Sequence, residues 1–213
     1  MLKEAFASDF AVEAVLLCEN QAENVTVPQG VACYCLPSHV MAAVCDTHTP
    51  QGCAAVLRMQ ERSADGKRLV VMDGVQDPGN VGTIIRTADA AGLDGVLMSS
   101  ACADPFSPKV LRATMGSVFH LPIRVTDALA PELASLRENG YTVISSQLDG
   151  MSFYDVPHPI ERFALVIGNE GNGVTDAVKA EANLHLKLPM RGKAESLNAA
   201  VAAGIMMYEL TRE

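Results

Sequence analysis

Several features are scarce or missing in this chain of 213 residues, and each absence argues against a class of protein. There is no Trp, and aromatic residues make up only 5% of the sequence, so a core must be built from Val, Leu, Ile, Ala and Met. No apolar run approaches the roughly 20 residues that a membrane-spanning helix needs. Neither the dinucleotide-binding pattern G-x-G-x-x-G nor a phosphate-binding loop ending in Gly-Lys-Ser/Thr occurs, which argues against NAD enzymes and NTPases.

Cysteine is present, but its spacing favours neither a metal site nor a redox pair. The six cysteines include no C-x-x-C pair, and Cys33 and Cys35 lie in an apolar run in which alternate positions share one face of a strand. Free cysteine in such a run is usually a small core residue, so we expect buried, reduced thiols and no metal. The first residues carry an early acidic side chain and lack a secretion-signal pattern, so we expect a cytoplasmic protein with no membrane partner.

Positive charge is also in short supply. Lys and Arg number 16 against 25 Asp and Glu, which gives a formal net charge of −9, and acid is in excess both before and after residue 68. Electrostatics of this sign oppose loose, charge-driven binding to nucleic acid. If the protein binds RNA, the contacts must come from a local basic patch.

Strand and helix patterns alternate along the chain from residue 69 onward. Short apolar runs predict strands at 69–73, 95–100, 120–125, 141–146, 163–167 and 184–188. Intervening segments predict helices at 81–91, 107–117, 128–138 and 174–182, and Gly140 is a good residue to terminate the third of these. Alternation at this spacing predicts an α/β fold in which helices cover both faces of a mostly parallel sheet.

Residues 1–62 predict a separate and smaller α/β unit. A short helix, apolar runs at 12–17 and 31–36, a helix at 38–45 and a strand at 54–59 follow one another. The polar stretch 63–68 is expected to link this unit to a second domain at 69–213.

Three polar turns are expected at strand ends, and the first contains Asp77-Pro-Gly-Asn80-Val-Gly82. Asn80 is well placed to cap the helix that follows, and capping alone would explain it. Arg86 lies on the flank of this helix away from its apolar face. Gly82, four residues earlier, is expected to clear the surface beside Arg86 for a phosphate or a ribose, with a solvated arginine as the alternative.

The second turn, Gly168-Asn-Glu170-Gly-Asn-Gly173, is rich in glycine. Its glycines let backbone amides approach a ligand closely. Glu170 is an unusual residue in such a turn unless it pairs with an arginine or a ligand. Polar side chains at neighbouring strand ends predict a ligand crevice, and with it an enzyme.

The third turn, Leu188-Pro-Met-Arg-Gly-Lys-Ala-Glu-Ser196-Leu-Asn198, opens the last helix. That helix is apolar nearly all round, so we expect it to be buried. Ser196 is a candidate N-cap. Asn198 is expected inside the first turn, where it needs a hydrogen-bond partner.

In these three blocks the chain resembles the SpoU (TrmH-type) branch of the SPOUT RNA methyltransferases. The family patterns N-x-G-x-x-x-R, G-x-E-x-x-G and P-M-x-G-x-x-x-S-L-N are met in order by residues 80–86, 168–173 and 189–198. The resemblance implies a 2′-O-ribose methyltransferase that uses S-adenosylmethionine, with a C-terminal trefoil knot. It also implies a homodimer whose site lies near the interface, and a substrate-binding role for residues 1–62, a unit that starts late relative to the family.

The resemblance also implies a set of site residues. Arg86 would position the ribose hydroxyl and stabilise developing negative charge, because a guanidinium is always protonated and makes a poor base. The residues that would orient Arg86, the ribose and the cofactor are Asn80, Glu170, Ser196 and Asn198. The residues that would contact the cofactor are Leu148, Gly168, Leu188, Met190 and Leu197.

The RNA contacts and the substrate are less narrowly defined. Lys109 and Arg112, supported by Arg191, form a candidate phosphate-binding patch, with an ordinary solvated face as the alternative. Ribosomal RNA is favoured over transfer RNA by the resemblance of the first unit, and DNA is excluded because it lacks the 2′-hydroxyl. The alternatives are a tRNA methyltransferase, an RNA- or cofactor-binding module with little catalysis, and a different nucleotide-using α/β enzyme.

Overall fold

The computed structural model describes residues 1–19, 25–45, 51–60, 62–156 and 159–212. The chain divides into two compact units, residues 1–61 and residues 62–213, and each is described by itself. Within the described residues, no helix combines the length and the apolar character that crossing a bilayer requires.

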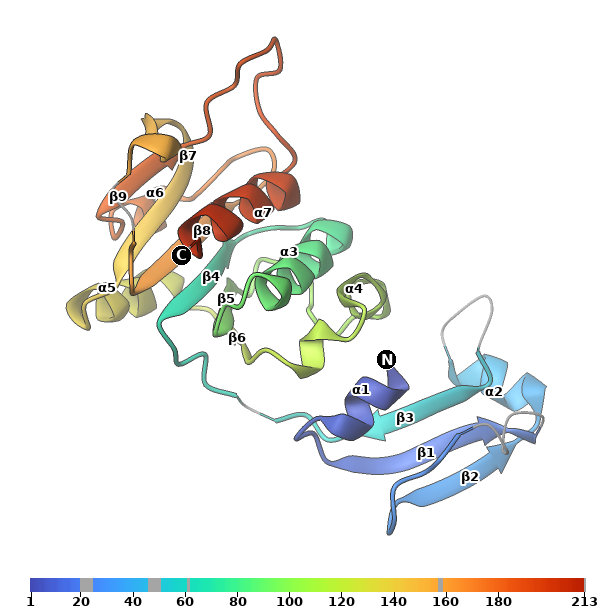
Figure 1. Cartoon of the computed structure of the whole chain (residues 1–213). Coiled ribbons are helices and arrows are strands. Elements are labelled where there is room, and N and C mark those ends of the chain that lie inside the picture. Colours follow the sequence, from blue (N-terminus) through green and yellow to red (C-terminus); the bar gives the residue numbers. More distant parts are fainter. Residues whose placement is uncertain (20–24, 46–50, 61, 157–158, 213) are drawn as a thin grey trace. The chain divides into compact units, whose positions relative to one another are not determined.

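The first unit is a three-stranded sheet accompanied by two short helices (Figure 1). Its elements are α1 (Leu2–Ala7), β1 (Val12–Cys18), β2 (Ala32–Leu36), α2 (Ser38–Val44) and β3 (Cys53–Leu57). Strand β1 is central and pairs parallel with β2 and antiparallel with β3. Val15 and Leu17 of β1 and Met41 of α2 are buried, so the small core lies along the central strand.

Cys33 and Cys35 are exposed, so the expectation that they are buried is wrong. Both lie on β2, which is an edge strand paired on one side only, and its residues 32–35 are all exposed. Cys18, on the central strand, is buried. The difference follows from position in the sheet, because a side chain on an edge strand has fewer neighbours to cover it.

The second unit contains a six-stranded sheet in which every pair of neighbours is parallel, in the order β6-β5-β4-β8-β7-β9. The strands are β4 (Arg68–Asp73), β5 (Gly95–Ser99), β6 (Ile123–Thr126), β7 (Thr142–Ser152), β8 (Phe163–Gly168) and β9 (Leu184–Lys187). The helices are α3 (Pro78–Ala90), α4 (Pro108–Thr114), η2 (Ser117–Phe119), α5 (Leu129–Glu138), η3 (Phe153–Asp155), α6 (Asp176–Lys179) and α7 (Ala199–Leu210). The predicted α/β fold is confirmed.

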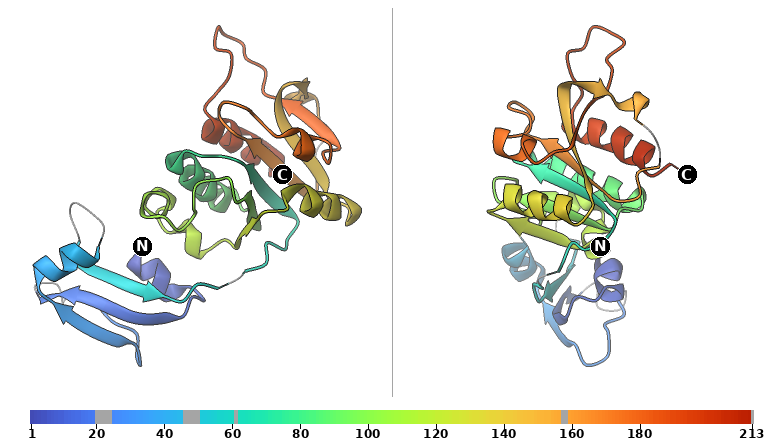
Figure 2. Two further views of the ribbon diagram at one scale, coloured as in Figure 1. Left: turned by 180° about the vertical axis from the view of Figure 1, so that it is seen from behind. Right: turned by 90° about the vertical axis from the view of Figure 1, so that its left-hand side faces the viewer.

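Helices cover both faces of this sheet, as Figure 2 shows. Val70 and Met72 of β4 pack into the cluster that includes buried residues of α3, α4 and α7. Their neighbours Leu69 and Val71 point the other way, into the cluster that includes residues of α5 and α6. Because both faces of a parallel sheet are buried, its central strands read as continuous apolar runs rather than alternating ones.

Helices α3 and α4 pack closely at Gly82, and this corrects the role expected for that glycine. A Cβ atom added at Gly82 would lie 2.4 Å from the Cβ of Ala113 and 2.9 Å from the carbonyl oxygen of Val110. Gly82 is buried, whereas Arg86 is exposed. The glycine therefore admits the neighbouring helix, and it does not clear a surface groove beside Arg86.

The chain enters β4 through several fixed contacts. The carboxylate of Asp94 accepts hydrogen bonds from the backbone N–H groups of Lys67 and Arg68, at 2.7 and 2.8 Å. The hydroxyl of Tyr141 donates to the carbonyl of Gly66, and the guanidinium of Arg162 lies over the Tyr141 ring, 4.5 Å from its centre. Residues 66–68, which the sequence places in a linker, are thus tied to the second unit.

Two expectations about helices have different outcomes: the one for the end of α5 is confirmed, and the one for the burial of α7 is wrong. Gly140 follows α5 with φ +83°, and its N–H donates to the carbonyl of Arg137, so it terminates the helix as predicted. Helix α7 is only half buried, because Val201, Ile205 and Tyr208 are 51%, 39% and 55% exposed. Helix α7 has apolar residues on two faces, and the rest of the second unit packs against only one of them.

The trefoil knot stays a prediction.

Candidate active site

The polar turns meet at one edge of the sheet because all six strands run in the same direction. Asp73, the last residue of β4, is the register partner of Gly168, the last residue of β8. The loop after β4 therefore lies beside the loop after β8. Such a crevice at the carboxyl ends of parallel strands is where open α/β sheets bind ligands.

A hydrogen-bonded network joins the three predicted turns. The side-chain amide of Asn80 donates from Nδ2 to Oε1 of Glu170 at 2.8 Å. Asn198 donates from Nδ2 to Oδ1 of Asn80 at 2.9 Å. Glu170 also accepts a 3.4 Å hydrogen bond from the backbone N–H of Gln76. Asn80 of the first turn is thus held by one residue from each of the other two turns, 90 and 118 positions away in the sequence.

Glu170 is held in its charged form. Partial desolvation raises its pKa, but the hydrogen bonds from the Asn80 side chain and from backbone N–H groups outweigh this, so the pKa of Glu170 is lowered. An ionised carboxylate can only accept hydrogen bonds. Glu170 therefore fixes which way the Asn80 amide points, with its nitrogen toward Glu170 and its oxygen toward Asn198.

The two helix starts at the site are capped by residues other than those expected. Asp77 is the N-cap of α3, accepting a 2.8 Å hydrogen bond from the backbone N–H of Asn80. Asn198 is the N-cap of α7, where its Oδ1 accepts from the backbone N–H groups of Ala200 and Val201. Neither Asn80 nor Ser196 is a cap. Because Asp77 has taken the capping role, the Asn80 side chain is left available for Glu170.

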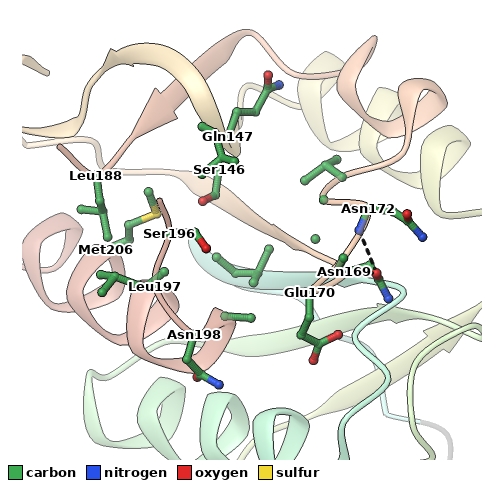
Figure 3. Close-up of a pocket in the computed structure, with 18 of the residues that line it drawn as sticks. Ser146, Gln147, Asn169, Glu170, Asn172, Leu188, Ser196, Leu197, Asn198 and Met206 are labelled. Carbon is green, nitrogen blue, oxygen red and sulfur yellow. Dashed lines mark hydrogen bonds between the residues drawn. The ribbon is translucent and has the colours of Figure 1, made fainter. Parts of the chain in front are cut away.

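A pocket of about 580 Å³ lies beside the network, which is within the usual range for a small-molecule site. All five residues predicted to contact the cofactor line it, namely Leu148, Gly168, Leu188, Met190 and Leu197. Glu170, Ser196 and Asn198 line it as well. Figure 3 shows Glu170 and Asn198 pointing to the same side of the pocket.

The lining combines apolar side chains with both signs of charge. Leu188, Met190 and Leu197 provide apolar surface, and the carboxylates of Asp149 and Glu170 and the amine of Lys179 provide charge. S-adenosylmethionine has an aromatic base, two cationic groups and one carboxylate. An apolar wall with two acidic residues and one basic residue fits that set of groups.

Arg86 is placed apart from the pocket lining. It lies exposed on α3, and within the described part of the chain its side chain forms no hydrogen bond or ion pair. The neighbouring Thr87 faces Gly204 of α7, since a Cβ at Gly204 would be 3.5 Å from its methyl group. Arg86 lies on a different flank of α3, the one that it shares with Gly82 four residues earlier, where α4 packs.

The residues predicted to contact RNA are all accessible. Lys109 and Arg112 lie exposed on α4, and Arg191 is exposed in the loop before α7. None of the three forms a salt bridge among the residues that the structure describes. Their charges are therefore free to meet a phosphate.

The structure also identifies site residues that the sequence patterns did not reveal. Asp77 could have been found, because an Asp followed by Pro is a typical start of a helix. Asn169 had no such signal: its side-chain amide donates to the carbonyl of Gly74 at 2.8 Å, a contact between two strand ends distant in sequence. Among the described residues, no group of three or more His, Cys, Asp and Glu side chains is arranged to hold a metal.

Comparison with known proteins gives consistent matches. The sequence profile of the SpoU rRNA Methylase family matches residues 67–208. The 23S rRNA (guanosine(2553)-2'-O)-methyltransferase RlmP of Bacillus subtilis (strain 168) is 41% identical over 212 residues, covering 99% of this chain and 85% of that protein.

Two solved structures extend the match to the fold. An AdoMet-bound rRNA methyltransferase from Sinorhizobium meliloti superposes with a TM-score of 0.86 at 31% identity, covering 98% of this chain and 83% of that one. The SpoU methyltransferase AviRb from Streptomyces viridochromogenes, in complex with AdoMet, gives a TM-score of 0.85 at 25% identity, covering 99% and 86%. The motifs, the network that joins them and these matches together show that the chain belongs to the SpoU rRNA methylase family.

Proposed function

We propose that this protein transfers a methyl group from S-adenosylmethionine to a ribose 2′-hydroxyl of ribosomal RNA. The observation that carries the proposal is the network of Glu170, Asn80 and Asn198 beside the pocket. It places the three family motifs in contact within a chain of the SpoU family. The B. subtilis relative is named for 23S rRNA, which makes that RNA the first substrate to test.

The bound cofactor would supply an electrophilic methyl group on a positively charged sulfur. Leu188, Met190 and Leu197 would enclose its base, and the backbone at Gly168, which lines the same pocket, would contact it. The negative charge of Glu170 lies at the same pocket and favours a cationic ligand. These residues would bind and orient the cofactor.

Arg86 would act on the RNA hydroxyl. The attacking oxygen gains negative character as its proton passes to water, and a nearby guanidinium would stabilise that charge without itself accepting a proton. Asn80 and Asn198 would hold the ribose and the start of α3 in place. The exposed Lys109, Arg112 and Arg191 would bind phosphates and so offer the local basic patch that a net charge of −9 requires.

The further partner in this proposal is a second copy of the chain. The exposed face of α7 formed by Val201, Ile205 and Tyr208 is apolar and spaced at helical intervals. Apolar faces of this kind on soluble proteins mark contact surfaces. Since the N-cap of α7, Asn198, lines the pocket, a homodimer formed on this helix would bring the site close to the interface.

The test measures transfer of labelled methyl from S-adenosylmethionine to 23S rRNA, to ribosomal subunits and to transfer RNA. We expect incorporation into the ribosomal samples, at a nucleotide whose linkage becomes resistant to alkaline hydrolysis because its 2′-oxygen is methylated. Arg86→Ala should lower the rate at least about a hundredfold, and Arg124→Ala, on the remote β6, should not.

The other possible results of this assay distinguish between the alternatives. Labelling of transfer RNA alone would favour the tRNA alternative. Tight RNA binding without transfer would favour the module with little catalysis. If neither S-adenosylmethionine nor RNA binds, the proposal is wrong.

A further inference from the structure

Asp73 is a buried carboxylate at the end of β4 that contacts the pocket only through another segment. The residue is 5% exposed, and its Oδ2 accepts a 2.7 Å hydrogen bond from the backbone N–H of Thr175. Asp73 does not line the pocket. Thr175 ends the segment 168–175, here called the glycine loop, whose residues 168–174 all line the pocket.

The other end of the glycine loop is held by Asn169. Its Nδ2 donates to the carbonyl of Gly74, the residue after Asp73, at 2.8 Å. Its Oδ1 accepts from the backbone N–H groups of Gly171 and Asn172, at 2.9 and 3.0 Å. One side chain thus shapes the turn and ties its beginning to the end of β4.

The glycine loop is also folded tightly on itself. The backbones of Asn169 and Gly173 exchange two hydrogen bonds of 2.9 Å. A Cβ atom at Gly168 would lie 2.2 Å from the carbonyl carbon of Gly173, so no side chain fits there. The loop is therefore a compact unit whose placement on the sheet depends on what holds its two ends.

We propose that Asp73 is a positioning residue for cofactor binding, which fixes the exit of the glycine loop through Thr175 as Asn169 fixes its start. Because Asp73 does not line the pocket, its effect on cofactor binding must pass through the loop. A hydrogen bond to a buried carboxylate is stronger than one between neutral groups. Its loss would also leave the Thr175 N–H without an acceptor. This inference rests on the proposed function, since the ligand used to test it is S-adenosylmethionine.

The first experiment compares cofactor affinity by calorimetry in full-length variants. We expect Asp73→Ala to weaken S-adenosylmethionine binding about tenfold, and Asp73→Asn to recover most of the affinity because its amide oxygen can still accept from Thr175. The matched control is Thr114→Val, which removes a buried hydroxyl that bonds only within α4. It should lower thermal stability and leave cofactor affinity unchanged.

A second variant removes the same hydrogen bond between Thr175 and Asp73 by changing the residue in the loop. Thr175→Pro removes the donating N–H, and the φ of −67° at this exposed position already suits proline. We expect it to reproduce the loss seen in Asp73→Ala, and the double variant to lose no more than either single one. Hydrogen exchange without ligand should be faster in the glycine loop of both variants than in the wild type or Thr114→Val.

The outcomes separate this inference from the proposed function. Wild-type affinity and wild-type loop protection in both Asp73→Ala and Thr175→Pro would overturn the inference, as would an equal loss of affinity in Thr114→Val. If Asp73→Ala does not fold, Thr175→Pro and Asp73→Asn still test the positioning role of Asp73. If the wild type binds no S-adenosylmethionine, the proposed function fails, whereas the exchange measurement still tests the hold of Asp73 on the loop.

Discussion

At the residue scale, the site depends on the asparagine side chain having a donor and an acceptor at once. Asn80 gives its N–H to Glu170 and its oxygen to Asn198. A residue with only acceptors or only donors could satisfy one neighbour and would repel or leave unpaired the other. This is a physical reason for Asn at position 80 that helix capping does not provide, since Asp77 is the cap.

Asn80→Asp, which barely alters the shape of the side chain, should therefore inactivate the protein. The new carboxylate keeps the acceptor for Asn198 but faces the carboxylate of Glu170, so the two turns are pushed apart. We expect the rate of methyl transfer to fall about a hundredfold, as small displacements of reacting groups do. The measurement is the initial rate at saturating cofactor, with Asn139→Asp after α5 as a control of equal charge. Equal rates in the two variants would contradict this account.

Glu170 makes stability depend on pH in a definite direction. Its pKa is lowered in the folded protein, so its ionised form is favoured by folding. The contribution is complete above the ordinary glutamate pKa, about 4.3, and is lost as the pH falls through the lowered value. Glu170→Gln should thus be less stable than the wild type at pH 7, with the difference shrinking as the pH is lowered to about 3.5. Thermal unfolding of both proteins at the two pH values measures this, and a constant difference would refute it.

At the scale of elements, close approach of helices depends on where glycine is placed. Gly82 admits α4, whereas Gly204 of α7 has ordinary space beside it, since a Cβ atom added there would lie 3.5 Å from the Thr87 methyl group. Both glycines lie inside helices, and the sequence pattern does not tell them apart. Only the packing of the neighbouring helix distinguishes a required glycine from a replaceable one.

Gly82→Ala should therefore destabilise the second unit, while Gly204→Ala should not. The added methyl group at Gly82 would overlap Ala113 and the Val110 carbonyl, and overpacking of this kind costs about 1–3 kcal/mol. At Gly204 the same change should add roughly 0.5–1 kcal/mol of stability through better helix propensity. Urea unfolding of both variants provides the comparison, and equal effects would show that the α3–α4 contact is not as tight as described.

At the scale of the whole molecule, the apolar face of α7 is the feature that bears on association with a second copy of the chain. Val201, Ile205 and Tyr208 remain exposed after the second unit has folded. The composition of the helix predicts full burial, and a second copy of the chain would complete it. The proposed dimer is thus the simplest reason why this apolar helix has one face uncovered.

Ile205→Asp should convert the proposed dimer into a monomer. A carboxylate in the middle of this face would have to be desolvated in the interface without a partner, which is strongly unfavourable. Sedimentation velocity at micromolar concentration measures the change, with Glu209→Asp on the same helix as the control. A wild-type protein that sediments as a monomer would contradict the proposal directly.

The amino-acid pattern alone was enough to specify the α/β class, the positions of most strands and helices, and the three motifs. These features are local: a continuous apolar run marks a strand buried on both faces, and glycine with polar residues marks its end. The match of spacing within each motif was also local, and it sufficed to predict residues that line the pocket.

What those residues touch was settled by packing in three dimensions. The exposure of Cys33, the burial of Gly82 and the open face of α7 each depend on which neighbour lies alongside, and a linear pattern does not state this. The same holds for the hydrogen bond that Asp73 accepts from Thr175, which joins residues 102 positions apart. Parallel strands bring distant segments to one edge of a sheet, so the site is assembled by strand order, which local sequence does not contain.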